Sequence, residues 1–166
     1  MATKELLDDL DLRILAEIQD DGRRAYTAVA KELDVSEATV RARVARMQRR
    51  GVLKFVVNVD PHTLGLFYVV LGLRVQGPGL KRAIEIMGSI PEVSYALVTA
   101  GTYDIVAEVV CRDHVDLLRL LRDEIRSIPG LQDVDTMTVL QTVKDQWGYP
   151  NILNRPQAAI DEDRRR

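Results

Sequence analysis

Hydrophobic residues recur every three or four positions through the first third of the chain, which is the spacing of amphipathic helices. Three helices are expected there: from Asp8 to Gly22, from Tyr26 to Leu33 and from Ser36 to Gly51. The β-branched run over residues 52–60 predicts a strand or wing. We therefore expect a winged helix-turn-helix domain over residues 1–60, with its two-helix motif at residues 26–45.

The pattern changes in the second half, where apolar runs alternate with amphipathic stretches. Their order is strand–helix–strand–strand–helix–strand, over residues 66–77, 80–90, 93–101, 103–111, 114–128 and 131–144. This order predicts a ferredoxin-like βαββαβ sandwich, so the whole chain is expected to be of the α+β class. We place a linker at residues 61–65, the sandwich at residues 66–146 and a polar, largely disordered tail at residues 147–166.

Each helix of the sandwich is expected to bury one stripe of side chains against the sheet. The stripes consist of Ala83, Ile84 and Met87 in the first helix, and of Val115, Leu118, Leu121 and Ile125 in the second. Because both helices lie on one face of the sheet, the other face needs a partner. A homodimer formed through that face is expected.

Composition narrows the class of protein. Of the 166 residues, 46% are hydrophobic and 29% are charged, which is ordinary for a globular protein. No apolar run approaches the ~18 residues of a membrane-spanning helix, and the N-terminus lacks the apolar segment of a signal peptide. With one cysteine, Cys111, and two separated histidines, His62 and His114, no metal site of the usual spacing is expected. We expect a cytoplasmic, nucleoid-associated protein that needs no membrane, metal or cofactor.

The formal net charge is −2, yet basic residues are concentrated at the third helix. From Arg41 to Lys54 there are six basic residues and no acid. A solvated basic face would account for such a run taken alone. However, Ala30, Asp34 and Val40 have the spacing of a small crossing residue, a tight turn and a locking residue in a helix-turn-helix. That geometry places the start of the third helix in the major groove of double-stranded DNA.

Two groups of residues are expected to contact DNA. Residues at the start of the third helix reach base edges, where Glu accepts from cytosine and Arg binds guanine. They are the cap Ser36, Glu37, Ala38, Thr39 and Arg41. Residues further along meet phosphates, which supply affinity but little sequence choice. They are Arg43, Arg46, Arg49, Arg50 and Lys54.

Several motifs occur in a fixed order: LDDLDLRIL leading to DGR, VSEATVRARV leading to RRGVL, then DPHTLG, GTYD and IPGLQDVDT. In this combination the chain resembles the Lrp/AsnC family of transcription factors, from about Leu7 to Val143. It departs from the family pattern at three positions. Members often have a polar helix cap in place of Ala25, a glycine in place of Asp34 and an acid in place of Thr102.

The resemblance implies that the ferredoxin-like half forms dimers, which assemble into tetramers or octamers. A small effector, commonly an amino acid, would bind where dimers meet. The matching residues are Gly101, Thr102, Tyr103 and Asp104, with hydroxyls added by Thr136 and Thr138. Gly101 would let backbone amides approach a carboxylate, and Asp104 would pair with an α-ammonium group. A hairpin turn alone would also account for this Gly-Thr loop.

The function expected from these features is sequence-specific regulation of transcription, with DNA affinity or oligomeric state modulated by the effector. An architectural DNA-binding protein without an effector is the alternative, since it would share every DNA-binding residue. A decarboxylase built on the same two-domain plan is a further alternative from another class. We do not expect an enzyme, because such a pocket needs histidine or arginine in the sandwich, whereas His62 and His114 lie in the linker and at a helix start.

Overall fold

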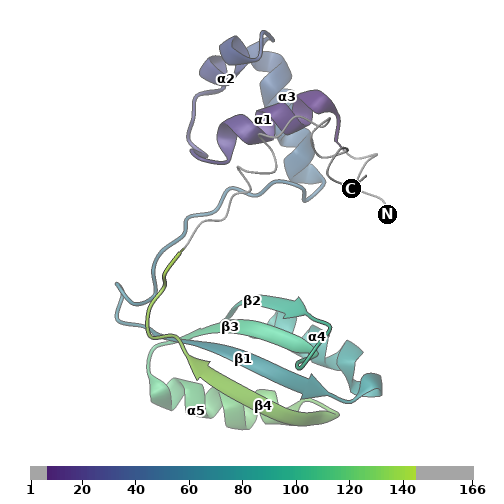
Figure 1. Ribbon diagram of the computed structural model, residues 1–166, viewed down its shortest axis with the longest axis vertical. Helices are drawn as coiled ribbons and strands as arrows, with labels where there is room; N and C mark the ends of the chain where they lie inside the picture. The colour runs from purple at the N-terminus through teal and green to yellow at the C-terminus, as the bar shows by residue number, and fades with distance from the viewer. Residues whose placement is uncertain (1–6, 145–166) are drawn as a thin grey trace, which may run out of the picture. The chain divides into compact units, whose positions relative to one another are not determined.

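The computed structural model describes residues 7–144, so the tail expected at residues 147–166 lies outside the described part. The chain divides into two compact units, and the division falls between Val57 and Asn58. The N-terminal unit contains the helices α1, α2 and α3, and the C-terminal unit contains a four-stranded sheet with two helices (Figure 1). None of the helices between residues 7 and 144 has the length and hydrophobicity needed to cross a membrane.

The three N-terminal helices are short and pack around one apolar core. They are α1 (Asp9–Ile18), α2 (Tyr26–Glu32) and α3 (Glu37–Arg49). Their core consists of Ile14, Ile18, Val29, Ala30, Leu33, Val40, Val44 and Met47. A capping box begins α1, in which the Asp8 carboxylate accepts from the Asp11 N–H and the Asp11 carboxylate accepts from the Asp8 N–H. The expected three-helix arrangement is confirmed.

The turn between α2 and α3 has the geometry that the sequence predicted. Asp34 has a φ of 54°, which is the left-handed conformation usually taken by glycine. The Val35 N–H donates to the Ala30 carbonyl at 3.0 Å and closes the turn. The start of α2 lacks a side-chain hydrogen bond at its cap, Ala25. This agrees with the absence of a polar cap in the sequence.

The run over residues 52–60 differs from the expectation of a strand or wing. Residues 53–60 have no strand assignment, and the segment forms no ladder with any other segment of residues 7–144. Val56 and Val57 are strongly exposed, with 72% and 91% of their surfaces accessible. β-propensity alone does not form a strand, because the backbone groups of a strand need a partner ladder.

The C-terminal unit has the expected ferredoxin-like order of elements. These are β1 (Phe67–Val75), α4 (Leu80–Ser89), β2 (Val93–Val98), β3 (Ile105–Cys111), α5 (His114–Asp123) and β4 (Leu131–Thr138), with 3-10 turns at Gly77–Gly79 and Ile125–Ser127. All pairs are antiparallel, and the spatial order of the strands is β2-β3-β1-β4 (Figure 1). The α+β class and the βαββαβ sandwich are therefore confirmed.

The helices cover one face of this sheet. In β1 and β3, alternate residues such as Val69, Leu71 and Val109 are buried in a core that also contains Met87 of α4 and Leu120 of α5. The opposite face carries apolar side chains that neither α4 nor α5 covers. They include Val70 in β1, Leu97 in β2, Val106 in β3 and Met137 in β4.

Two predicted stripes are partly wrong. In α5 the sheet buries Leu117 and Leu120, whereas Val115 and Leu118 are 61% and 64% exposed. This helix has apolar residues on two adjacent stripes, so spacing alone does not decide which one faces the sheet. In α4, Ala83 and Met87 are buried as expected, but Ile84 is 44% exposed. The other two residues of the predicted stripe are confirmed, because Ile125 is buried and Leu121 is partly buried against the core.

Candidate nucleic-acid interface and effector loop

The helix α3 is fixed by its buried stripe and by its cap. Val40, Val44 and Met47 face the core, so the opposite side of the helix faces outward. The hydroxyl of Ser36 accepts from the Thr39 N–H at 3.1 Å and lies 2.8 Å from the Thr39 hydroxyl. Ser36 is therefore engaged in starting the helix, as predicted.

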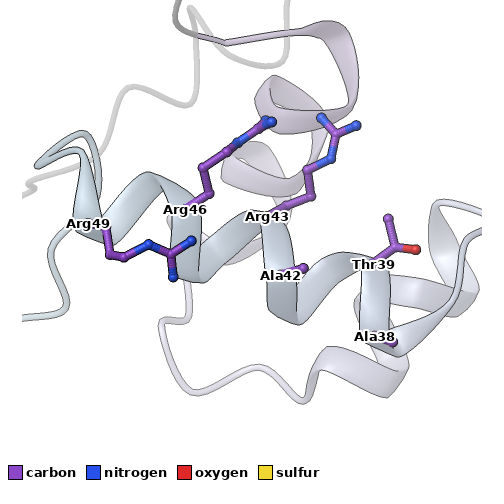
Figure 2. A pocket seen from close by; sticks show the side chains of 6 residues that line it. All are labelled: Ala38, Thr39, Ala42, Arg43, Arg46 and Arg49. Atoms are coloured by element: carbon purple, nitrogen blue, oxygen red, sulfur yellow. The ribbon is translucent and has the colours of Figure 1, made fainter.

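The outward side of α3 has a shallow hollow of about 500 Å³. Its lining consists of Ala38, Thr39, Ala42, Arg43, Arg46 and Arg49 (Figure 2). The two small alanine side chains form the floor of the hollow, and the three arginines form its border. A surface with small apolar residues between guanidinium groups suits a polyanion with a ridged shape, such as a DNA strand at the edge of the major groove.

Arg41 is held beside α2 and the start of α3. Its guanidinium pairs with Glu37 one turn earlier and lies 5.4 Å from the centre of the Tyr26 ring. Glu37 and Arg41 were both predicted to contact base edges. In the structure they bind one another, and Tyr26 is a partner that the sequence analysis did not name.

Arg43 and Arg46 have acidic partners on α1. Arg43 pairs with Asp8 and, at 3.2 Å, with Asp11, while Arg46 pairs with Asp11. Asp11 is fully buried. The hydrogen bond from Arg43, followed by the bond from the Asp11 N–H, lowers the pKa of Asp8, and the same contact with Asp8 raises the pKa of Arg43. Both side chains extend to the same side of α3, whereas Arg49 points elsewhere (Figure 2).

Arg43 and Arg46 were predicted to contact phosphates, and their pairing with these carboxylates was not predicted. Asp8 and Asp11 are 35 and 32 positions away from Arg43, so no local spacing pairs them. The available signal was an apolar helix stripe interrupted by Asp11, because a charged residue at a core position needs a buried partner.

The remaining predicted phosphate contacts are solvent-exposed. Arg49, Arg50 and Lys54 all have exposed side chains. Arg49 makes no ion pair with any residue between positions 7 and 144. Its guanidinium is thus available to an external anion.

The predicted effector loop connects β2 and β3. Gly101 has a φ of 149°, which a side chain would strain, and Thr102 is exposed. The Asp104 carboxylate accepts from the Val75 N–H at 2.8 Å, and the Asp104 N–H donates to the Leu73 carbonyl at 2.9 Å. Asp104 therefore ties the loop to the end of β1.

Tyr103 lies over the face of the sheet that the helices leave open. A Cβ atom on Gly72 would be 2.8 Å from the Tyr103 ring, so the ring packs directly on the β1 backbone. Its hydroxyl donates to the Asp135 carboxylate, and this bond, with desolvation next, raises the pKa of Tyr103. The contacts of Tyr103 with Gly72 and Asp135 were not predicted from the sequence.

Thr136 and Thr138 are not brought together with Tyr103. They pair with Leu71 and Val69, whose side chains face the helices, whereas Asp135 pairs with Gly72 on the open face. Both threonines are exposed near the sheet edge. Tyr103 and the two threonines thus occupy opposite faces of the sheet.

The two histidines and the cysteine lie outside helix α3 and outside the predicted effector loop. Within residues 7–144, no three of the side chains of His, Cys, Asp and Glu are grouped so that they could hold a metal ion. His62 and His114 are both exposed. Cys111 is buried, and burial raises the pKa of its thiol.

Comparison with known proteins decides the family. The model of the AsnC-type helix-turn-helix domain matches residues 7–48, and that of the Lrp/AsnC ligand binding domain matches residues 68–148. An HTH-type transcriptional regulator of Pyrococcus furiosus is 34% identical over 150 residues, which cover 89% of this chain and 100% of the relative. The chain belongs to the Lrp/AsnC family of transcriptional regulators.

Solved structures of transcriptional regulators share the fold of this chain. The structure of Escherichia coli AsnC is 31% identical and covers 84% of this chain and 96% of its own, with a TM-score of 0.69. A transcriptional regulator of Neisseria meningitidis in complex with L-Met is 19% identical and covers 88% of this chain and 97% of its own, with a TM-score of 0.72. The family predicted from the motifs is confirmed, and the chain joins a DNA-binding helix-turn-helix domain to a ligand-binding domain.

Proposed function

We propose that this chain regulates transcription by placing α3 in the major groove of specific DNA sites, and that an amino acid binding to the C-terminal unit changes this affinity or the oligomeric state. The observation that carries the first part is the outward surface of α3. It combines a capped helix start, two alanines and three arginines around one hollow, and the side chain of Arg49 is exposed.

Within this proposal, the residues of α3 have different roles. Ala38, Thr39, Glu37 and Arg41 at the helix start contact base edges, where small side chains permit close approach. Arg49, Arg50 and Lys54 contact phosphates. The pair between Glu37 and Arg41 is exposed, and exchange of such a pair for a base edge costs little, because exposed ion pairs contribute only about 0–1 kcal/mol.

The experiment first selects bound duplexes from a random pool and then measures binding to the selected site by fluorescence anisotropy. Arg49→Ala is expected to weaken selected and random duplexes alike and to reduce the dependence of log affinity on log salt by about 0.9. Glu37→Gln is expected to change the preferred bases while leaving the salt dependence unchanged. Arg126→Ala removes one exposed charge from the C-terminal unit and is the matched control.

The proposal fails if the wild-type protein does not bind duplex DNA at low salt. It also fails if Arg49→Ala behaves like Arg126→Ala. If the selected duplexes share no motif, for wild type and for Glu37→Gln alike, the protein binds DNA without sequence specificity, and that part of the proposal is wrong.

The effector is proposed to be an amino acid, which is recognised through its carboxylate and ammonium groups. Support comes from the match to the Lrp/AsnC ligand binding domain and from the Neisseria meningitidis relative in complex with L-Met. In this chain, exposed Thr102 and the backbone at Gly101 would face the carboxylate, and Asp104 would meet the ammonium group. A homodimer formed through the open sheet face, and larger assemblies of it, would bring several such loops together.

The effector test uses a variant that preserves the fold of the loop. Asp104→Ala would remove the acceptor of the Val75 N–H, whereas Asp104→Asn keeps an oxygen acceptor and removes the charge. A panel of amino acids is titrated into wild type, Asp104→Asn and the control Asp123→Asn, and heat of binding and light scattering are recorded. Wild type and Asp123→Asn should respond to the same amino acid, and Asp104→Asn should respond at least about tenfold more weakly.

One observation favours the alternative of an architectural protein without an effector. The Asp104 carboxylate already serves the loop by accepting from the Val75 N–H, so a structural role accounts for its presence. If no amino acid gives heat, changes the assembly mass or shifts the DNA-binding isotherm, the effector proposal is wrong and this alternative stands.

A further inference from the structure

The ion pairs between α1 and α3 engage arginines of the proposed DNA-binding surface. We name Asp8, Asp11, Arg43 and Arg46 the α1–α3 ion cluster. Two of the three arginines that border the hollow on α3 belong to this cluster. Their guanidinium groups are thus already bound to carboxylates of the same chain.

The two acids of the cluster differ in burial. Asp11 is fully buried and contacts both arginines, and a buried carboxylate is tolerated only when it is paired and hydrogen-bonded. Its contacts with Arg43 and Arg46 therefore belong to the folded core. The Asp8 side chain is 52% exposed, so its pair with Arg43 is open to water and to competing anions.

A phosphate group and a carboxylate bind a guanidinium in the same way, through paired N–H donors and negative oxygens. Arg43 cannot direct the same N–H groups to Asp8 and to a DNA phosphate.

We propose that Asp8 is an intramolecular competitor of DNA: it occupies the Arg43 guanidinium in the free protein and must release it to a phosphate when the duplex binds. Asp11 is the positioning residue that keeps Arg43 and Arg46 at the border of the hollow during this exchange. The inference rests on the proposed DNA-binding role of α3. It predicts that removing the Asp8 charge strengthens DNA binding.

Asp8→Asn tests this without removing the helix cap, because Asn caps helices as well as Asp does. The matched control is Asp9→Asn, which removes the same charge from the next residue, an exposed one in the first turn of α1. Thermal melting first establishes that both variants are folded. Asp8→Ser, which also caps, replaces Asp8→Asn if the latter is unstable.

Affinity for one duplex is measured at several salt concentrations by fluorescence anisotropy. Asp8→Asn is expected to bind about two- to fivefold more tightly than Asp9→Asn, the range that corresponds to an exposed ion pair. Because Arg43 meets a phosphate in both variants, the slope of log affinity against log salt should stay the same, and the gain in affinity should appear at every salt concentration. A helix cap without this role would not change the affinity. In an Arg43→Ala background, the difference between the two variants should vanish.

Equal affinities of Asp8→Asn and Asp9→Asn overturn the inference, as does a difference that persists without Arg43. A different result contradicts the proposed function itself: wild-type protein that does not bind the duplex at low salt. If wild-type protein binds the duplex and Asp8→Asn has the same affinity as Asp9→Asn, the proposed function stands and only the role of Asp8 as a competitor is rejected.

Discussion

Asp34 takes a backbone conformation that most residues avoid. Its φ of 54° lies in the left-handed region, where a Cβ atom crowds the following carbonyl at a cost of roughly 1 kcal/mol. Glycine reaches this region without that cost. The left-handed conformation of Asp34 therefore lowers the stability of the helix-turn-helix.

We predict that Asp34→Gly raises the free energy of unfolding by about 0.5 kcal/mol, because relief of the crowding outweighs the added freedom of the unfolded chain. Asp34→Ala should lower it, since alanine lacks the local hydrogen bonding that makes Asp tolerable there. Urea unfolding of the three proteins measures both changes. A more stable Asp34→Ala would contradict this account of the turn.

Gly72 is required by the close packing of Tyr103. A methyl group at this position would stand 2.8 Å from three atoms of the ring. We predict that Gly72→Ala lowers the free energy of unfolding by about 1–3 kcal/mol, the usual cost of overpacking. In a Tyr103→Ala background the same substitution should cost much less, and a thermodynamic cycle by urea unfolding measures the coupling. Additive effects would show that the ring does not rest on Gly72.

At the scale of elements, the cap of α5 makes stability depend on pH. The Asp113 carboxylate accepts from the Asp116 N–H at 2.9 Å and from the Val115 N–H at 2.8 Å, and the bond from Asp116 is the main cause of the lowered pKa of Asp113. A group whose pKa is lower in the folded state stabilises the fold above its unfolded pKa. That stability is lost as the pH falls through the folded value.

We therefore predict that part of the stability disappears below about pH 4, near the ordinary pKa of Asp. Asp113→Asn keeps a cap that does not titrate, so it should lose less stability than wild type between neutral and acid pH. Glu124→Gln removes a carboxylate next to the other end of the same helix and serves as the control. Urea unfolding at both pH values gives the differences. Parallel losses in wild type and Asp113→Asn would exclude the cap as the cause.

The order and type of the elements were predictable because helix caps, glycines and hydrophobic spacing are local signals. Ser36, Asp8 and Gly51 mark helix ends in the sequence, and the structure places helix boundaries beside them. The choice of stripe on α5 was not predictable. Val115 and Leu118 compete with Leu117 and Leu120, and only the position of the sheet selects between them.

The candidate site was predictable as a surface but not in its electrostatics. The arginines of α3 are adjacent in sequence, so their concentration on one helix is visible there. Their partners are not, because Asp8 and Asp11 come from α1 through the tertiary fold. The same applies to Tyr103, whose contacts with Gly72 and Asp135 depend on strand register.

At the scale of the whole molecule, we propose that a second subunit packs on the open face of the sheet. Leu97 and Met137 on this face are 44% and 42% exposed, and neither α4 nor α5 covers them or Val106. Apolar surface of this kind is removed from water when two sheets pack face to face. A dimer built in this way would present two copies of α3 to the successive major grooves of one duplex.

We predict that Val106→Lys, at the centre of the open face, separates the dimer, because two like charges would have to be buried against each other. Val115→Lys places the same charge on exposed α5 on the helix side and is the control. Light scattering should give a monomer mass only for Val106→Lys. Its DNA affinity should fall well below that of the control, since each α3 then binds alone and the gain from linked binding is lost. A monomeric wild type, or an unchanged mass for Val106→Lys, would show that the open face does not hold the subunits together.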